Sequence, residues 1–305
     1  MGRLPGSEGG ELMRVLLTGT SGFIGRHLHR ALLDRGDQVF GIDLHATPLA
    51  HHGDALDFFR RDEERYDLAI HCAANVGGRA SIDGSPLAVA TNMALDAWYF
   101  QWLVRTGTPR AVYFSSSAAY PVELQQPGDI HRLVEDDIDL NNPGLPDASY
   151  GLAKVTGERL AQYAEAEGCR VHVLRPFSGY GEDQADCYPF PAFIGRAKRR
   201  EDPFEVWGDG SSTRDWIHVD DVVGATLAAI DHDVTGPVNL GWGRATSFDQ
   251  LAGQVTAAAG YTPRIKHLPT APQGVHHRVC DPTRMLGYYQ PAVTLEEGIR
   301  RALNS

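Results

Sequence analysis

The chain has few cysteines and no long apolar run. Its four cysteines, Cys72, Cys169, Cys187 and Cys280, lie far apart and form no Cys-x-x-Cys pair. This spacing indicates neither a zinc site nor a disulfide framework, and no secretory apolar segment precedes them, so we expect a cytoplasmic protein. No apolar run reaches the ~20 residues that a membrane-spanning helix needs. The 13 histidines also lack the helical spacing of a metal site. We therefore expect neither a membrane span nor a bound metal.

Positive charge is also scarce. Lys and Arg total 28 against 39 Asp and Glu, which gives a net charge of -11. That balance opposes non-specific binding to nucleic acids and to anionic membranes, so neither is an expected partner. The one dense basic run, Arg196 and Lys198 to Arg200, is interpreted as a solvated helix face or, alternatively, as a phosphate contact. With 305 residues, of which 42% are hydrophobic, the chain is long enough to bury a large core.

The segment from Val15 to Gly25, VLLTGTSGFIG, carries the strongest functional signal. A short apolar strand leads into Gly19, Gly22 and Gly25. In a dinucleotide site the first glycine makes the tight turn, the second lets backbone N–H groups approach the diphosphate, and the third lets the next helix pack closely. The N-terminus of that helix then faces the anion. A plain strand-to-helix turn is the alternative interpretation.

A second strand, Gln38 to Asp43, ends in a carboxylate about twenty residues beyond the glycines. An aspartate there accepts hydrogen bonds from both hydroxyls of the adenosine ribose and repels a 2′-phosphate. Leu44 and His45 supply no Lys or Arg to offset that repulsion. The pattern favours NAD over NADP, although a solvated strand end would also finish on Asp.

A third group of polar residues follows the strand Ala111 to Phe114, which runs into Ser115, Ser116 and Ser117. Further on, Tyr150 and Lys154 lie one helical turn apart. A phenol is a poor base at neutral pH unless a nearby cation favours the phenolate, and Lys154 or an oxidised nicotinamide would do so. A serine at the strand end can hold the substrate oxygen whose proton moves.

Together these motifs resemble the extended short-chain dehydrogenase/reductases, specifically the NAD-dependent epimerase/dehydratase family that acts on nucleotide sugars. The resemblance covers most of the chain and implies Ser116, Tyr150 and Lys154 as the catalytic set. It also implies a set of NAD-binding residues: Gly19, Ser21, Gly22, Phe23, Ile24, Gly25, Asp43, Asp54, Ala55, Ala73, Ala74, Asn92, Ser115, Tyr150, Lys154 and Pro176.

The same resemblance suggests where a nucleotide-diphosphate sugar binds. Arg214 and Arg278 correspond to diphosphate-binding arginines, a role that suits the planar fork of a guanidinium, and Asp281 lies near the nucleotide ribose. Each arginine could instead form a surface ion pair. Ser117 is a further substrate-binding candidate, and Arg79 is expected to meet a sugar carboxylate or to cap its own loop.

Strand-like and helical stretches alternate from Met13 to about Arg175, which is typical of an α/β, Rossmann-type doubly wound parallel sheet. Strands are expected at residues 15–17, 39–42, 68–71, 111–114 and 171–174, and helices at 25–35, 89–106 and 150–168. Prolines then break the pattern, as a smaller C-terminal substrate lobe would require. We expect a flexible extension over 1–12, an NAD-binding domain over 13–175 and about 214–242, and a nucleotide-sugar lobe over 176–213 and 243–305.

The reaction is predicted from what surrounds Tyr120. Related dehydratases and decarboxylases carry acids two or three residues before this tyrosine, where Ala118 and Ser117 stand, and 3,5-epimerases carry a cysteine in place of Ala118. The surrounding loop nevertheless looks most like that of the 3,5-epimerases.

Ser116, Tyr150 and Lys154 alone suffice for reversible oxidation of a secondary alcohol, so we expect a 4-epimerase that works through a 4-keto intermediate. The alternatives are a 4-ketoreductase, a 3,5-epimerase of the GDP-sugar type and a non-catalytic dinucleotide sensor. The stretch from Gly128 to Asp147 is longer than usual for the family and is expected to shape the sugar pocket. Relatives commonly form homodimers through the helices expected at 89–106 and 150–168.

Overall fold

The structure is a computed structural model, and it describes residues 12–45, 47–48, 50–77 and 84–305. Arg79 and nearly all of the expected N-terminal extension lie outside the described residues.

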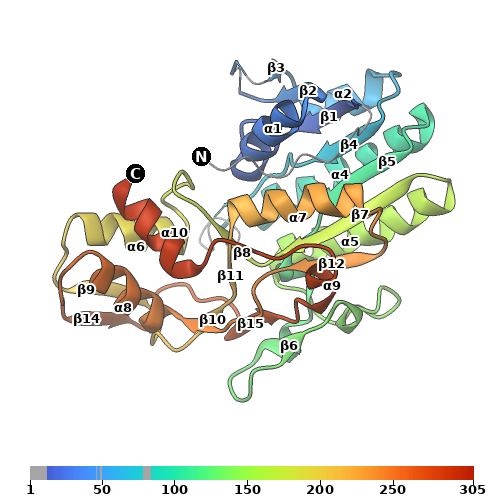
Figure 1. The fold of residues 1–305 in the computed structure, drawn as a ribbon. Coiled ribbons are helices and arrows are strands. Elements are labelled where there is room, and N and C mark those ends of the chain that lie inside the picture. The colour runs from blue at the N-terminus through green and yellow to red at the C-terminus, as the bar shows by residue number, and fades with distance from the viewer. Residues whose placement is uncertain (1–11, 46, 49, 78–83) are drawn as a thin grey trace.

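A seven-stranded parallel sheet forms the centre of the larger half of the molecule (Figure 1), in the order β12-β7-β5-β4-β1-β2-β3. This confirms the predicted α/β fold of Rossmann type. Every expected strand forms, mostly with one or two residues more than predicted. The strands are β1 (Arg14–Thr18), β2 (Gln38–Asp43), β3 (His51–His52), β4 (Leu68–His71), β5 (Arg110–Phe114), β7 (Arg170–Pro176) and β12 (Pro237–Leu240).

Helices cover both faces of this sheet, which is why its central strands β1, β4 and β5 are mostly apolar and buried. On β1, Val15 and Leu17 point to one face and Leu16 points to the other, and all three are fully buried. The first face packs against α1 (Phe23–Arg35) and α7 (Val219–Asp231), and the second against α2 (Ala55–Arg61), α4 (Pro86–Thr106) and α5 (Ala148–Ala166).

The strand order reverses beside β1. The chain first builds β1, β2 and β3 outward in one direction and then places β4, β5, β7 and β12 on the other side of β1. In open α/β sheets, ligands bind at the carboxyl ends of the strands next to such a reversal. The glycine turn after β1, Asp43 at the end of β2, and the serines after β5 therefore meet at one edge of the sheet.

The smaller half contains most of the remaining strands and helices. Its four-stranded sheet has the order β13-β10-β15-β6, and β14 pairs with β9. The stretch after Gly128 contributes β6, which pairs with β15 through Arg132 and Val279 and so forms the edge of this sheet. The strands are β6 (Arg132–Leu133), β9 (Phe204–Trp207), β10 (Thr213–Arg214), β13 (Thr246–Ser247), β14 (Ile265–Leu268) and β15 (His277–Cys280), and the helices are α6 (Pro189–Lys198), α8 (Phe248–Ala258) and α10 (Leu295–Asn304). The short α9 (Thr283–Leu286) packs instead against β12 of the central sheet.

A two-stranded ladder of β8 (Ser178–Tyr180) and β11 (Trp216–His218) joins the halves, and three short 3₁₀ helices, η1 (Ser117–Ala119), η2 (Val122–Gln125) and η3 (Glu135–Asp137), follow β5 and β6. The domain boundaries given above stay a prediction. Within the described residues, none of the helices combines the length and the apolar character needed to cross a membrane.

Candidate active site

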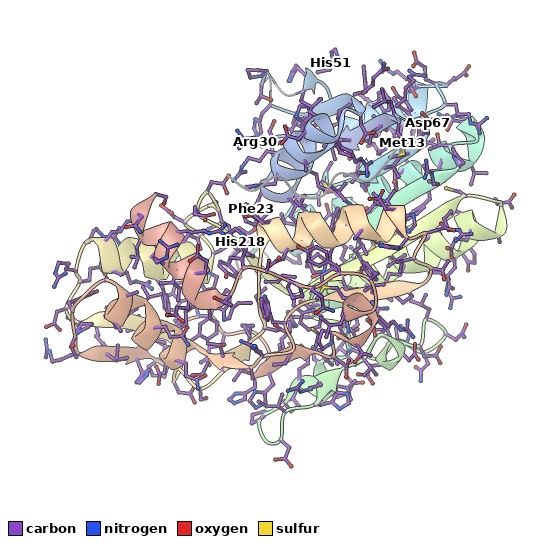
Figure 2. The ribbon with its side chains drawn as sticks, viewed as in Figure 1. Met13, Phe23, Arg30, His51, Asp67 and His218 are labelled. Carbon is purple, nitrogen blue, oxygen red and sulfur yellow. The ribbon has the colours of Figure 1, made fainter. Side chains whose placement is uncertain are left out.

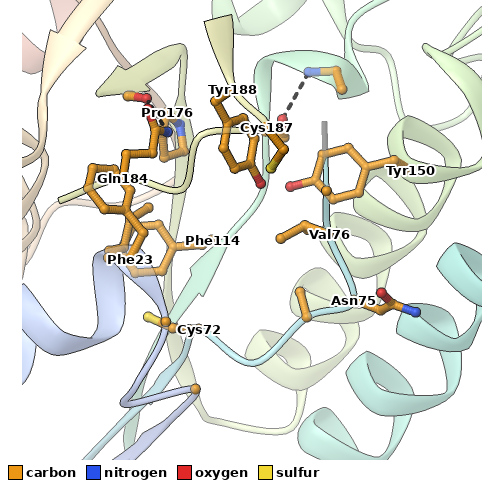
Figure 3. Close-up of a pocket in the computed structure, with 18 of the residues that line it drawn as sticks. Phe23, Cys72, Asn75, Val76, Phe114, Tyr150, Pro176, Gln184, Cys187 and Tyr188 are labelled. Carbon is orange, nitrogen blue, oxygen red and sulfur yellow. Dashed lines mark hydrogen bonds between the residues drawn. The ribbon is translucent and has the colours of Figure 1, made fainter. Parts of the chain in front are cut away.

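A cavity of about 1320 Å³ lies at the carboxyl ends of the central strands, between the sheet and the smaller half (Figure 3). Sites for one small molecule usually measure ~300–1,000 Å³, so this cavity has room for a dinucleotide and a second ligand. It is bordered by all sixteen residues predicted to bind NAD, and by Ser116, Arg214 and Arg278. Ser117 and Asp281 do not border it, and Arg79 lies outside the described residues.

The turn after β1 fits the close approach of a diphosphate. Gly19 has a φ of +71°, a conformation that favours glycine, and its N–H donates to the Ile42 carbonyl at 2.8 Å. A Cβ on Gly25 would lie only 2.0 Å from the Gly19 carbonyl oxygen, so only glycine lets α1 start this close to the turn. No side chain caps the first turn of α1, whose N–H groups are thus available to an anion.

The end of the cavity that is predicted to hold the adenosine, called the adenosine end below, is acidic. The Asp43 carboxylate accepts hydrogen bonds from the backbone N–H groups of Ser21 (2.9 Å) and His45 (3.0 Å), which fix it at the end of β2. Asp54 caps α2 by accepting from the Leu56 N–H at 2.7 Å. None of the described lining residues between 42 and 56 is Lys or Arg. This half of the cavity therefore suits a ribose with free hydroxyls better than one with a 2′-phosphate.

Ser116 and Tyr150 are brought together by a contact between their two segments. The Ser116 hydroxyl accepts from the Ala118 N–H at 3.1 Å and so caps η1. The Asp147 N–H, at the start of α5, donates to the Ala118 carbonyl at 2.9 Å. One turn along α5, the Lys154 ammonium lies 5.9 Å from the centre of the Tyr150 ring. A serine hydroxyl, a phenol and an ammonium therefore border the same part of the cavity.

Asn92 fixes the loop that follows β4. Its amide oxygen accepts from the Asn75 N–H at 2.6 Å, and its amide N–H₂ donates to the Asn75 carbonyl at 2.9 Å. The Asn92 side chain is buried, so this pair of bonds holds the loop against α4 at the floor of the cavity.

The end of the cavity that is predicted to hold the substrate, called the substrate end below, is basic. Arg278 donates to the Gln125 side chain at 2.7 Å and to the Asp147 carboxylate at 2.8 Å, and these bonds orient its guanidinium. Arg214 donates to the Thr213 carbonyl at 2.7 Å and stacks on the Phe248 ring at 5.4 Å. Arg196 borders the same region. Positive charge is therefore gathered locally in a chain that is acidic overall.

Sequence reasoning missed three residues that border the reactive part of the cavity: Asp147, Cys187 and Tyr188. In Figure 3 the rings of Tyr150 and Tyr188 face each other, and Cys187 lies beside them. Burial, with smaller contributions from Tyr150 and Cys187, raises the pKa of Tyr188 to about 12, so its hydroxyl is a hydrogen-bond donor and not a base. Tyr188 and Cys187 lie in a proline-broken stretch with no periodic signal.

The loop that follows β8 begins at Gly181 and packs against Phe23 in the first turn of α1. Phe23 and the nearby His218 are labelled in Figure 2. Asp183 on this loop accepts from the Arg26 Nε at 2.7 Å and lies 3.0 Å from the His27 Nε2. Burial raises the pKa of Asp183, but hydrogen bonds from Arg26 and His27 outweigh burial and lower it below its usual value. A loop from the smaller half is therefore tied to the helix that begins at the glycine turn.

Comparisons with known proteins agree with this geometry. A sequence profile of the NAD dependent epimerase/dehydratase family matches residues 15–241. The chain is 30% identical to a dTDP-4-dehydro-6-deoxy-D-allose reductase from Streptomyces sp over 89% of each chain. It is 29% identical to GDP-mannose 3,5-epimerase 1 from Oryza sativa subsp. indica, over 95% of this chain and 80% of the relative. The structure of a UDP-glucose 4-epimerase from Thermotoga maritima with UDP-glucose is similar, with a TM-score of 0.79, 26% identity and coverage of 96% of this chain and 98% of the other.

Proposed function

The chain belongs to the NAD-dependent epimerase/dehydratase family, whose cofactor is NAD, and on that premise we propose that it is a nucleotide-sugar 4-epimerase. The proposal rests mainly on which side chains border the cavity next to Ser116. Ser116, Tyr150 and Lys154 border the cavity, and the neighbouring wall position is Ala118, which offers neither an acid nor a thiol. Ser116, Tyr150 and Lys154 support oxidation and reduction of an alcohol, and Ala118 supplies no group that could expel water or remove a proton from carbon.

Bound NAD supplies a hydride acceptor and donor. Tyr150 removes the proton of the sugar 4-hydroxyl, and Ser116 donates a hydrogen bond to the oxygen as it becomes a ketone. Lys154 favours the phenolate form of Tyr150. The 4-keto sugar then rotates in the cavity, so that C4 is reduced from its opposite face and its configuration is inverted. Tyr150 returns the proton to the C4 oxygen. Arg214 and Arg278 hold the diphosphate throughout, so the sugar turns while the nucleotide stays bound.

A 4-ketoreductase is the second candidate, and the 30% identity to a dTDP-4-dehydro-6-deoxy-D-allose reductase favours it. The catalytic set would be the same, but the cofactor would be exchanged in each turnover. Asp43 would then favour NADH over NADPH, because its carboxylate repels a 2′-phosphate.

Proton NMR in D₂O, with UDP-, dTDP- and GDP-sugars and no added cofactor, tests these alternatives. Conversion to the C4 epimer with no deuterium in the ring is the result expected of a 4-epimerase. Conversion only when a 4-keto sugar and reduced cofactor are supplied would indicate the reductase. Deuterium at C3 or C5 would indicate a 3,5-epimerase, for which Cys187 or Tyr188 would be the first residues to test.

We also propose that the enzyme is a cytoplasmic homodimer that pairs through α4 and α5. Both helices expose large apolar side chains, Leu87 and Val104 on α4 and Leu152 and Tyr163 on α5. Sedimentation equilibrium should give twice the mass of the chain, and Leu152→Glu should shift the equilibrium toward monomer.

A further inference from the structure

Lys154 carries its charge in a place that water barely reaches. Its side chain is 4% exposed, and its ammonium lies 4.9 Å from the centre of the buried Tyr113 ring. An ammonium in such a site is costly unless an opposite charge compensates it. The proposed mechanism needs this positive charge beside Tyr150, so the question is which negative charge stabilises the Lys154 ammonium.

Two buried carboxylates lie near this lysine, and they differ in their partners. Glu158, one turn along α5, binds the Arg175 guanidinium through both oxygens at 2.6 and 2.8 Å, so an arginine already neutralises it. Asp96, on α4, accepts from the Tyr113 hydroxyl at 2.6 Å, and its other oxygen lies 3.3 Å from His71 Nε2. In the part of the chain that the structure describes, no arginine or lysine bonds directly to Asp96.

His71 does not supply the missing positive charge. Burial lowers the pKa of His71, more than the nearby Asp96 raises it. Its Nδ1 lies 2.7 Å from the Thr18 hydroxyl, while its buried Nε2 makes no hydrogen bond of good geometry. Burial raises the pKa of Asp96, but Lys154, His71 and Tyr113 together lower it below its usual value, so Asp96 is ionised.

We propose that Asp96 is the buried counter-ion of Lys154 and acts across the Tyr113 ring to keep the ammonium charged beside Tyr150. Asp96 is thus a positioning residue for proton transfer. Its effect on turnover rests on the proposed function, whereas the charge pairing itself does not. The titratable groups that face Lys154 come from its own helix and from three neighbouring elements: Tyr150 and Glu158 on α5, Tyr113 on β5, Asp96 on α4, and His71 and Cys72 at the end of β4.

The test uses the fact that the chain has only three lysines, Lys154, Lys198 and Lys266. In protein labelled with [13Cε]lysine, NMR follows the titration of each ammonium separately. Asp96→Asn keeps the shape of the side chain, its amide oxygen can still accept from Tyr113, and its N–H₂ can donate to His71. We expect the titration midpoint of Lys154 to fall by about one to two pH units in this variant, with Lys198 and Lys266 unmoved.

Two further variants secure the measurement. Glu205→Gln removes the partner of Lys266, which lies 2.9 Å away, so it should move only the Lys266 signal and assign it. If Asp96→Asn does not fold, Asp96→Thr, which is neutral and keeps a hydroxyl for Tyr113, must give the same fall. An unchanged Lys154 midpoint in a folded neutral variant would overturn the proposal.

Turnover gives the second readout. Removing the negative charge should move both limbs of the pH–rate profile toward lower pH and reduce kcat about tenfold or more, with KM and bound NAD unchanged. A merely structural role for Asp96 would lower activity without moving the limbs. Should wild-type protein show no 4-epimerisation, the NMR titration still decides whether Asp96 and Lys154 are paired.

Discussion

The two ends of the cavity are built in different ways. At the adenosine end, the contacts join residues about twenty positions apart, such as Asp43 and the N–H of Ser21. At the substrate end, Arg278 is oriented by Asp147 and Gln125, which lie 131 and 153 residues away in the chain. The first end follows from one βαβ unit and is the end predicted to hold the cofactor. The second end, predicted to hold the substrate, depends on contacts between segments that are far apart in the sequence.

The largest expected effect lies where the two ends meet. Tyr150→Phe removes the proton acceptor and should cut turnover more than a hundredfold while NAD stays bound. Tyr188→Phe is the matched control, because the raised pKa of Tyr188 keeps its hydroxyl protonated, and the substitution should cost less than about tenfold. Steady-state rates and the NAD content of the purified variants check this prediction. Unchanged turnover in Tyr150→Phe, or an equal loss in both variants, would break the assignment of the base.

A substitution at the substrate end should affect only that end. Arg278→Gln removes a charged hydrogen-bond donor to the diphosphate and should raise KM for the nucleotide sugar about tenfold to a hundredfold, with NAD content unchanged. Arg300→Gln, which breaks an exposed ion pair with Glu297 outside the cavity, should leave KM unchanged. Loss of NAD from Arg278→Gln would show that the two ends are not separate.

At the adenosine end, Asp43→Asn removes the charge that disfavours a 2′-phosphate. The ratio of NADP to NAD dissociation constants, measured by calorimetry on cofactor-free protein, should fall about tenfold. Asp57→Asn, an exposed position on the neighbouring α2, should leave the ratio as in wild type. If the ratio does not change in Asp43→Asn, this carboxylate does not select the cofactor.

The smallest expected effect concerns the loop that joins the two ends. Asp183→Asn should release NAD up to about fivefold faster at neutral pH, because partly exposed ion pairs contribute at most ~1 kcal/mol. The pKa of Asp183 is lowered, so the ion pair persists from neutral pH to below the usual aspartate value and is lost as the pH falls through the lowered value. The two proteins should therefore converge only at acid pH. Asp231→Asn, which pairs with Arg35 at the far end of α1, is the control, and a difference independent of pH would contradict this account.

The same contrast explains what the sequence could predict. The glycine turn, Asp43, and the step from Tyr150 to Lys154 depend on local geometry, and the structure brings all of them to one cavity. The roles assigned to these residues stay predictions. The alternative for Arg278 was a surface ion pair, but the pair that it forms with Asp147 is largely buried, and the arginine borders the cavity. No sequence pattern predicted Asp147 as the partner of Arg278, because this contact depends on how segments far apart in the sequence pack together.

The sequence also could not predict which buried charges outside the motifs lie close to the site. Asp96 lies among apolar residues of α4, and nothing in its spacing connects it with Lys154 on another helix. The stretch from Gly128 to Asp147 was expected to shape the sugar pocket. In the structure its last residue, Asp147, borders the cavity, and the stretch also adds β6 to the edge of the smaller half's sheet.

The central claim is that the enzyme oxidises and reduces the same sugar with an NAD that it retains. The most direct test mixes equal amounts of two forms of the sugar that turns over, one deuterated at C4 and the other labelled with 13C in the nucleotide. Mass spectrometry of the epimers should find deuterium only in molecules without 13C, because each hydride returns to the sugar that gave it. Deuterium in the 13C-labelled epimer, or its loss when unlabelled NADH is added, would contradict the account.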